Sequence, residues 1–247
     1  MKITFLGTGT SSGVPYIGCK CAVCSSTDPR DKRLRCSSLL EVDGVKILID
    51  CGPDFRQQAL ANGLTHIDAV LLTHEHVDHM MGIDDLRPFR NVDVYANDLT
   101  VKALLRVYAY CFNNDYPGIP SLSLHEIDEQ PFLVKGIEVT PITAFHYCLP
   151  VMGFRIGNFG YLTDVKFISD DELAKLKGLD LFVIDALRHK KHLSHPSVEE
   201  ALAIVEKIKP KQTYFVHMSH DFGLHEEQEA LLPANVHVAY DGLSLSF

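Results

Sequence analysis

Side chains of metal-binding types crowd into the segment THEHVDH, residues 73–79. Imidazole nitrogens together with a carboxylate oxygen suit zinc, manganese or iron. The spacing predicts a loop whose turn spreads the side chains, because they would not share one face of a helix. His74 and His76 could hold one metal ion. Asp78 and His79 could hold a second, at the separation of about 3.5–4 Å that two-metal hydrolases use. The alternative is a charged surface turn after a buried strand.

A second candidate metal site is the segment GCKCAVC (18–24), with Cys19, Cys21 and Cys24. The chain has seven cysteines, an odd number, and the reducing compartment that we expect makes disulfides improbable. Thiolates clustered in this way predict a zinc site that still needs a fourth ligand. A disulfide and a chance cluster are the alternatives. We interpret the other cysteines as ordinary buried thiols, namely Cys36, Cys51, Cys111 and Cys148.

Length and charge limit the class of protein. With 247 residues, 46% of them hydrophobic, the chain can form a sizeable core, and we interpret residues 1–247 as one domain. The formal net charge of −9 argues against extended nucleic acid as a partner, since that partner needs a basic face. No apolar run reaches about 18 residues, and the first residues lack the features of a signal peptide. We therefore expect a cytoplasmic protein with no membrane partner.

Apolar segments that end in polar residues would position the candidate ligands. IDAVLLTH (67–74) predicts a strand buried on both faces, so His74 would stand at its carboxyl end, the edge where ligands gather in layered α/β proteins. Further strands are expected at 2–7, 37–42, 46–52, 132–146, 152–164, 179–186, 212–220 and 236–247, and helices at 53–63, 97–112, 169–178 and 195–210. Ser169 would cap one of these helices, and Pro196 would lie near the first turn of another. The pattern predicts a layered α/β fold with mixed sheets.

The order of these motifs resembles that of the metallo-β-lactamase superfamily, whose fold is an αββα sandwich. The resemblance runs along most of the chain, through FLGTGTSSGVP (5–15), ILIDCG (47–52), THEHVDH (73–79), FHY (145–147), GYLTD (160–164) and YFVHMSHD (214–221). Order and spacing fit better still to the PhnP-type phosphodiesterases, a branch that opens a cyclic phosphate on ribose phosphate. tRNase Z is a more distant relative. In the PhnP-type branch, a segment like GCKCAVC carries a structural zinc.

The resemblance implies two catalytic divalent metals, manganese or zinc with iron as a further candidate. By resemblance, the ligands are His74, His76 and His146 for the first metal, Asp78, His79 and His217 for the second, and Asp164 as the bridge. Asp50 would support a ligand through a hydrogen bond rather than bind a metal itself. His220 would be the fourth ligand of the structural zinc, beside the three clustered cysteines.

Two metal ions with a shared hydroxide suit attack on phosphorus, and the departing oxygen then needs a proton. Asp78 and Asp164 would take part in catalysis by holding the metals. His195 is the expected general acid or substrate-orienting residue, because it stands just before Pro196 and the next helix, where the PhnP-type pattern has this histidine. His192 is the reserve candidate. A solvated loop at a helix entry is the alternative interpretation.

The leading functional hypothesis is a phosphodiesterase for a small cyclic or nucleotide-like phosphodiester, such as a ribose cyclic phosphate. tRNA 3′-end processing is a second hypothesis, although the chain has no glycine- and lysine-rich arm for tRNA. Thioester or lactone hydrolysis and a non-catalytic metal-binding module are the others. Residues 84–90 and 108–122 would form the pocket, where aromatic side chains could cover a sugar or base, or could form a lid or a homodimer contact. The candidates for holding a second phosphate are Arg87, Arg90, Arg155 and Arg188.

Overall fold

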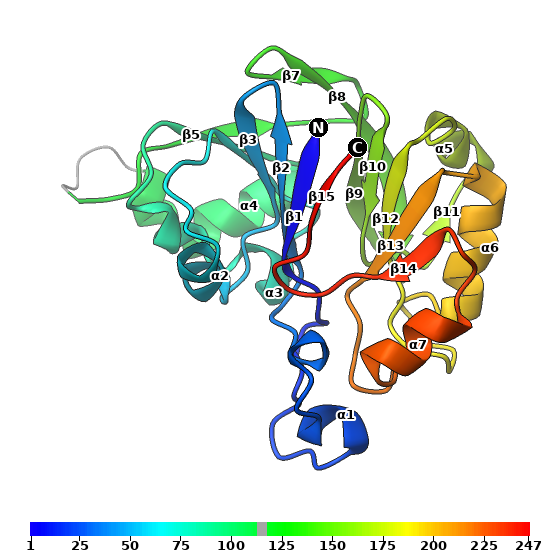
Figure 1. Ribbon diagram of the computed structural model, residues 1–247. Coiled ribbons are helices and arrows are strands. Elements are labelled where there is room, and N and C mark those ends of the chain that lie inside the picture. The colour runs from blue at the N-terminus through cyan, green and yellow to red at the C-terminus, as the bar shows by residue number, and fades with distance from the viewer. Residues whose placement is uncertain (113–117) are drawn as a thin grey trace.

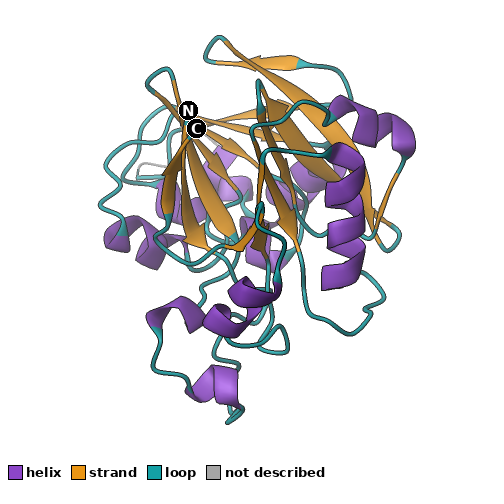
Figure 2. Ribbon diagram, turned by 45° about the vertical axis from the view of Figure 1, so that its right-hand side comes forward, coloured by secondary structure: helices purple, strands orange, loops and turns teal. Residues whose placement is uncertain are grey.

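Mixed β-sheets pack face to face in the centre of the molecule, and helices cover their outer faces (Figure 1 and Figure 2). The structure is a computed structural model that describes residues 1–112 and 118–247, and within these residues the strands form two sheets. This arrangement confirms the predicted αββα sandwich. The two termini lie side by side at one end of the molecule, and α1 (Ala22–Ser25) projects from the other end (Figure 1).

The first sheet is built from the amino-terminal part of the chain and is completed by the last strand. Its strands lie in the order β15 (Ser244–Ser246), β1 (Lys2–Gly7), β2 (Ser37–Val42), β3 (Val45–Ile49), β4 (Ala69–Leu71), β5 (Val92–Ala96) and β6 (Leu122–Glu126). β2 and β3, both expected as strands, form a hairpin around the turn at 42–44. From β3 to β6 the strands run parallel, so their carboxyl ends share one edge.

The second sheet brings its carboxyl ends to a shared edge in the same way. Its strands lie in the order β11 (Phe167–Ile168), β8 (Ile137–His146), β9 (Leu149–Ile156), β10 (Phe159–Leu162), β12 (Leu181–Asp185), β13 (Gln212–Val216) and β14 (Val236–Val238), and β7 (Phe132–Val134) pairs with β8. β10, β12, β13 and β14 are parallel. Because β9 is antiparallel to both β8 and β10, β8 points the same way as β10 and ends at the same edge.

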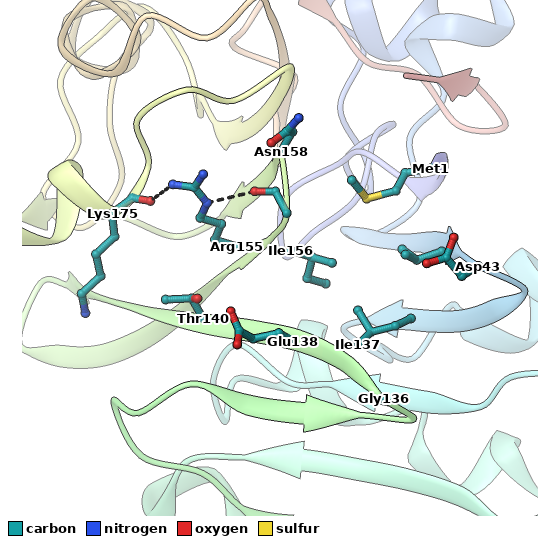
Figure 3. A pocket seen from close by; sticks show the side chains of 12 residues that line it. Met1, Asp43, Gly136, Ile137, Glu138, Thr140, Arg155, Ile156, Asn158 and Lys175 are labelled. Carbon is teal, nitrogen blue, oxygen red and sulfur yellow. Dashed lines mark hydrogen bonds between the residues drawn. The ribbon is translucent and has the colours of Figure 1, made fainter.

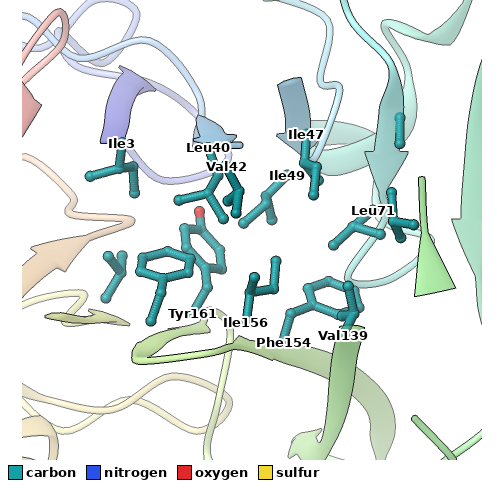
Figure 4. Close-up of a cluster of buried hydrophobic side chains, with 14 of the residues drawn as sticks. Ile3, Leu40, Val42, Ile47, Ile49, Leu71, Val139, Phe154, Ile156 and Tyr161 are labelled. Carbon is teal, nitrogen blue, oxygen red and sulfur yellow. The ribbon is translucent and has the colours of Figure 1, made fainter. Parts of the chain in front are cut away.

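An apolar core between the sheets holds them together (Figure 4). Leu40 and Ile49 project into it from the first sheet, and Phe154 and Tyr161 project from the second. All four side chains are fully buried. Burying an apolar side chain of this size contributes about 1.5–3 kcal/mol. The core therefore fixes how the sheets face each other, and with them the edge at which their strands end.

Helices surround the two sheets, and several of them bury apolar side chains against the outer faces. They are α2 (Phe55–Ala61), α3 (Val77–Met80), α4 (Asp98–Val107), α5 (Asp170–Lys175), α6 (Val198–Ile208) and α7 (His225–Leu231), with 3-10 turns at η1 (Pro29–Asp31), η2 (Ile83–Leu86) and η3 (Ala109–Phe112). Leu104 of α4 joins the cluster on the first sheet, and Val205 of α6 joins that on the second. The helices that the structure describes are all too short or too polar to span a membrane.

Several element boundaries differ from the prediction, and the differences fall at turns. The expected strand 132–146 is the hairpin of β7 and β8, because Lys135 and Gly136 both have positive φ and reverse the chain. The expected strand 152–164 is likewise divided into β9 and β10. The expected helix 97–112 ends at Val107.

The two helix starts agree with the prediction, whereas the THEHVDH motif differs from it in part. Ser169 caps α5 as predicted. Pro196 lies near the first turn of α6, as predicted: it directly precedes Ser197, which caps this helix in a capping box with Glu200. The motif is not a loop throughout, since its second half forms α3, which begins directly after His76.

Candidate metal centre

The candidate ligands meet at the edge where parallel strands of both sheets end. His74 follows β4, Asp164 follows β10 and His217 follows β13, while β8 ends at His146 itself. The core fixes these strand ends, so residues far apart in the chain reach one place. All four side chains are buried.

Asp164 lies in the middle of this group, with its two carboxylate oxygens facing different histidines. Its Oδ2 atom lies 3.7 Å from His74 Nε2 and 3.9 Å from His146 Nε2. Its Oδ1 atom lies 3.2 Å from His217 Nε2 and 3.6 Å from His79 Nε2. The carboxylate thus stands between two sets of nitrogen donors, and the sets divide as the resemblance implies for two metals.

The other predicted ligands fall on the matching sides of Asp164. Two of the groups whose ligand atoms lie within 4.8 Å of one another are His74, His76 and Asp164, and Asp78, His79 and His217; a third joins Asp164 and His217 to Asp185 and His195. Within the second group, Asp78 Oδ2 lies 3.2 Å from His79 Nε2 and 3.3 Å from His217 Nε2. The donors of each group are therefore close enough together to share one ion.

The buried atoms of the centre fit divalent metal ions. Among the described residues, His74 Nε2 and His79 Nε2 are buried and have no hydrogen-bond partner. Such orphaned nitrogens are costly unless they bind something, and neutral imidazole is a common metal ligand. Burial disfavours the charged form of Asp164, yet the neighbouring histidines, His217 foremost, lower its pKa overall. Two dications would offset the buried carboxylates and satisfy the orphaned nitrogens together.

Asp50 supports the centre through hydrogen bonds, as the sequence predicts for it. It is fully buried after β3 and accepts from Thr73 N at 2.8 Å and from Thr73 Oγ1 at 2.9 Å. His79 Nδ1 donates to Asp50 Oδ2 at 2.7 Å, which leaves His79 Nε2 to face the metal side. The same Thr73 hydroxyl also contacts the neighbouring ligand, because His74 Nδ1 lies 3.0 Å from Thr73 Oγ1. These contacts set the ring orientation of both histidines.

Backbone strain is concentrated in this centre. The φ angle is 61° at Asp50, 57° at Asp164 and 57° at His217, which are left-handed values that L-residues rarely adopt. Each costs on the order of 1–3 kcal/mol and is typical of functional sites. The loop after β3 also lies very close to α3. A Cβ atom at Gly52 would overlap the carbonyl oxygen of Asp78, so only glycine fits there.

His195 lies beside the centre, with a partner that the sequence motifs did not indicate. His195 Nδ1 is 3.4 Å from Asp185 Oδ2 and 3.9 Å from Asp164 Oδ2. Asp185 ends β12 and is fully buried. Burial lowers the pKa of His195 to about 4, whereas burial and the charge of Asp164 raise that of Asp185 to about 8. Asp164 follows the buried strand β10, and the segment LFVID (181–185) likewise ends an apolar strand in an aspartate, which is the pattern that could have indicated Asp185.

The reserve candidate His192 lies farther out on the same loop. Its ring centroid is 5.1 Å from that of His195, and it is more exposed. Its Nδ1 atom accepts a hydrogen bond from Ser194 N at 3.3 Å. His189, the first histidine of this loop, turns away and lies 2.6 Å from Gln228 Oε1.

The arginines considered for a second phosphate are dispersed. Arg87 pairs with Asp84 at 2.6 Å, Arg188 pairs with Asp221 at 3.3 Å, and Arg90 is exposed. These contacts leave open which of the three reaches a substrate. Residues 113–117, part of an expected pocket segment, lie outside the described residues.

Arg155 lies at the other end of the molecule. It lines a hollow of about 910 Å³, and its side chain donates to the carbonyl oxygens of Gly157 and Lys175 (Figure 3). Asn158, in the same hollow, precedes β10, whereas Asp164 follows that strand. The hollow therefore lies at the opposite strand edge, which removes Arg155 from the candidates for holding a second phosphate beside the metal centre.

The three clustered cysteines and His220 form a separate group, with ligand atoms within 4.8 Å of one another. Cys19 Sγ and Cys21 Sγ each lie 3.5 Å from His220 Nδ1. The backbone N–H of Cys24 and the side chain of His220 lower the pKa of the Cys21 thiol to about 6, while burial raises that of Cys24 to about 11. Three sulfurs and one nitrogen suit a closed, structural zinc site.

The other cysteines follow the prediction with one exception. Cys36, Cys51 and Cys111 are buried. Cys148 is exposed, because it lies in the tight turn between β8 and β9.

Comparison with known proteins agrees with this architecture. The beta-lactamase superfamily domain matches residues 45–218. A Porphyromonas gingivalis protein named octanoyltransferase is 44% identical over 98% of this chain and 51% of its own length. The chain spans about half the length, or less, of the first curated relatives that it matches.

Solved structures extend the comparison to the whole chain. The crystal structure of a diphosphatase from the PhnP family is 43% identical, with a TM-score of 0.94 over 100% of this chain and 96% of the other. Human tRNase Z, short form, shares the fold, with 20% identity and a TM-score of 0.72 over 100% of this chain and 99% of the other. The chain therefore belongs to the beta-lactamase superfamily and, within it, to the PhnP family.

Proposed function

We propose that this protein is a metal-dependent hydrolase and, more narrowly, a phosphodiesterase for a small cyclic or nucleotide-like phosphodiester. The observation that carries the proposal is the central carboxylate of Asp164, whose oxygens face two separate sets of histidine nitrogens. This is a geometry for two neighbouring divalent cations, manganese or zinc with iron as a further candidate. Similarity to a PhnP-family diphosphatase supports a phosphate ester or anhydride as the substrate class.

When bound, two such cations supply positive charge to the phosphate and activate a water molecule for attack. The chain's own residues then hold and orient these partners. His74, His76 and His146 would hold one cation, Asp78, His79 and His217 the other, with Asp164 between them. Asp50 keeps His79 facing the metals through the hydrogen bond at 2.7 Å.

His195 and Asp185 would supply the proton that the departing oxygen needs. His195 Nδ1 lies 3.4 Å from Asp185 Oδ2, so the two groups can share a proton. An anionic substrate beside His195 favours its charged form and so draws the proton onto the imidazole. His195 would then donate it to the leaving alkoxide as a general acid, with Asp185 holding the ring in place.

Metal analysis of the purified protein combined with a substrate screen tests this function. The screen contains cyclic nucleotides, ribose cyclic phosphates, linear phosphodiesters, a diphosphate ester and a precursor tRNA. It also contains a lactone and an octanoyl thioester, the latter because one relative is named for octanoyl transfer. We expect two catalytic metals per chain and hydrolysis of a small phosphodiester. Activity on thioesters or lactones alone would overturn the proposal, as would a metal-loaded protein that cleaves nothing in the screen.

A further inference from the structure

Tyr147 occupies an unusual place directly after the ligand His146. It begins the two-residue turn between β8 and β9, in which His146 pairs with Leu149. Its φ angle is 59°, a position for which two-residue turns prefer glycine, asparagine or aspartate. The tyrosine side chain is 62% exposed. A large aromatic side chain is thus kept at a strained turn position without being buried.

Packing in the fold does not account for this tyrosine. Within residues 1–112 and 118–247, its side chain has no hydrogen bond and no aromatic-ring contact. Asp50, Asp164 and His217 share its left-handed backbone, and all three belong to the metal centre. The other non-glycine residues with positive φ in the described part of the chain are the polar residues Asp43, Asn91, Lys135 and Lys209. Tyr147 therefore shares a strained backbone with three residues of the centre that it adjoins.

Two exposed aliphatic side chains also lie next to residues of the metal centre or to a residue that hydrogen-bonds one of them. Val77 is 62% exposed and lies between the ligands His76 and Asp78. Leu193 is 68% exposed and precedes Ser194, whose carbonyl oxygen accepts from His146 Nδ1 at 2.8 Å. The rings of His76 and His146 lie 5.1 Å apart, so the three segments meet around the metals. We call Val77, Tyr147 and Leu193 the apolar collar.

We propose that the apolar collar binds a planar aromatic ring of the substrate, an aryl group or a nucleobase, joined to the phosphate that the metals hold. An aromatic side chain can stack on such a ring, and the aliphatic side chains can cover its edges. A sugar phosphate without a base would leave the collar exposed to water and gain nothing from it. The inference rests on the proposed function and narrows its substrate class toward nucleotide-like esters.

The test compares substrates with and without the ring in Y147F, Y147G and L193A. The substrates are a 2′,3′-cyclic nucleotide, the matching base-free ribose cyclic phosphate, and bis(p-nitrophenyl) phosphate as the aryl arm. We expect Y147G to lower kcat/KM for the cyclic nucleotide by roughly 10-fold more than for the base-free compound, while Y147F stays near the wild type. L193A should shift the same ratio more weakly. L133A is the control, because Leu133 is 64% exposed on β7, away from the metals.

Thermal unfolding separates this role from a structural one. Glycine adopts positive φ without strain, so Y147G should melt no lower than the wild type even as it loses ring selectivity. Equal losses on ring-bearing and base-free substrates, or a clearly lower Tm, would overturn the inference. So would a change of oligomeric mass in Y147G, since the collar would then be a contact with a second copy of the chain.

A binding measurement keeps the inference distinguishable from the proposed function. Calorimetry on the metal-loaded protein compares adenosine monophosphate with ribose 5-phosphate in the wild type and in Y147G. If the wild type hydrolyses none of the phosphodiesters, the proposed function fails. Ring-selective binding that disappears in Y147G would still support the collar, and its absence would refute the collar alone.

Discussion

Replacing His220 with alanine should remove a zinc ion and loosen a long-range connection. The imidazole nitrogen lies 3.5 Å from Cys19 Sγ and from Cys21 Sγ, which are 201 and 199 residues away along the chain. A crosslink that closes a loop of this length restricts the unfolded chain by about 5 kcal/mol in the chain-entropy model. The three cysteines left in H220A lack the fourth ligand of a closed zinc site, and they no longer join the two ends of the fold.

We therefore expect H220A to lose up to about 5 kcal/mol of the free energy of unfolding, with typical crosslinks contributing about 2–4 kcal/mol. For a chain of this size, that corresponds to a Tm lower by roughly 5–15 °C. Elemental analysis should show one zinc fewer per chain, and calorimetry the lower Tm. H220C is the matched control, because a fourth thiolate should restore both. Unchanged zinc content would refute the metal site, and zinc loss without a lower Tm would refute its stabilising role.

The remaining predictions concern the catalytic centre and a buried carboxyl group. H195A should keep both catalytic metals and lose roughly 100- to 10,000-fold in turnover, since it removes the proposed general acid; full activity in steady-state kinetics would contradict that assignment. G52A should destabilise the fold by about 1–3 kcal/mol and weaken metal binding, because the added Cβ overlaps the Asp78 carbonyl oxygen; normal metal content and Tm would show that the loop adjusts freely. Burial raises the pKa of Asp241 from 3.8 to about 6, so the folded protein holds a proton there that the unfolded chain releases at lower pH. The free energy of unfolding should therefore fall by about 3 kcal/mol between pH 4 and pH 7 through this group, and D241N should lack that fall. Urea titrations of both proteins at several pH values check this, and parallel profiles would contradict it.

Apolar patterning predicted much of the fold, because local signals determine which face of an element is buried. The strand 2–7 and the strands at 37–49 are in place, and the predicted layered α/β fold with mixed sheets is confirmed, as is the αββα sandwich that the resemblance implied. Errors arose where a turn interrupts an apolar run. Lys135–Gly136 and Gly157–Asn158 divide segments that read as single strands, and the glycines there are the turn signals. The pairing of β15 with β1 joins the two ends of the chain, so no local pattern could indicate it.

The sequence by itself determined the chemistry of the centre: which side chains can bind metals, and their order along the chain. Resemblance suggested how they divide between two metals, and the tertiary structure produces that division, since the two oxygens of Asp164 acquire different histidine neighbours when strand ends of both sheets meet. The same folding brings Asp185 to His195 and leaves Tyr147 exposed beside His146. The physical reason is that residue type and spacing are local properties. Proximity between β4, β10 and β13 instead depends on sheet order and core packing along the whole chain.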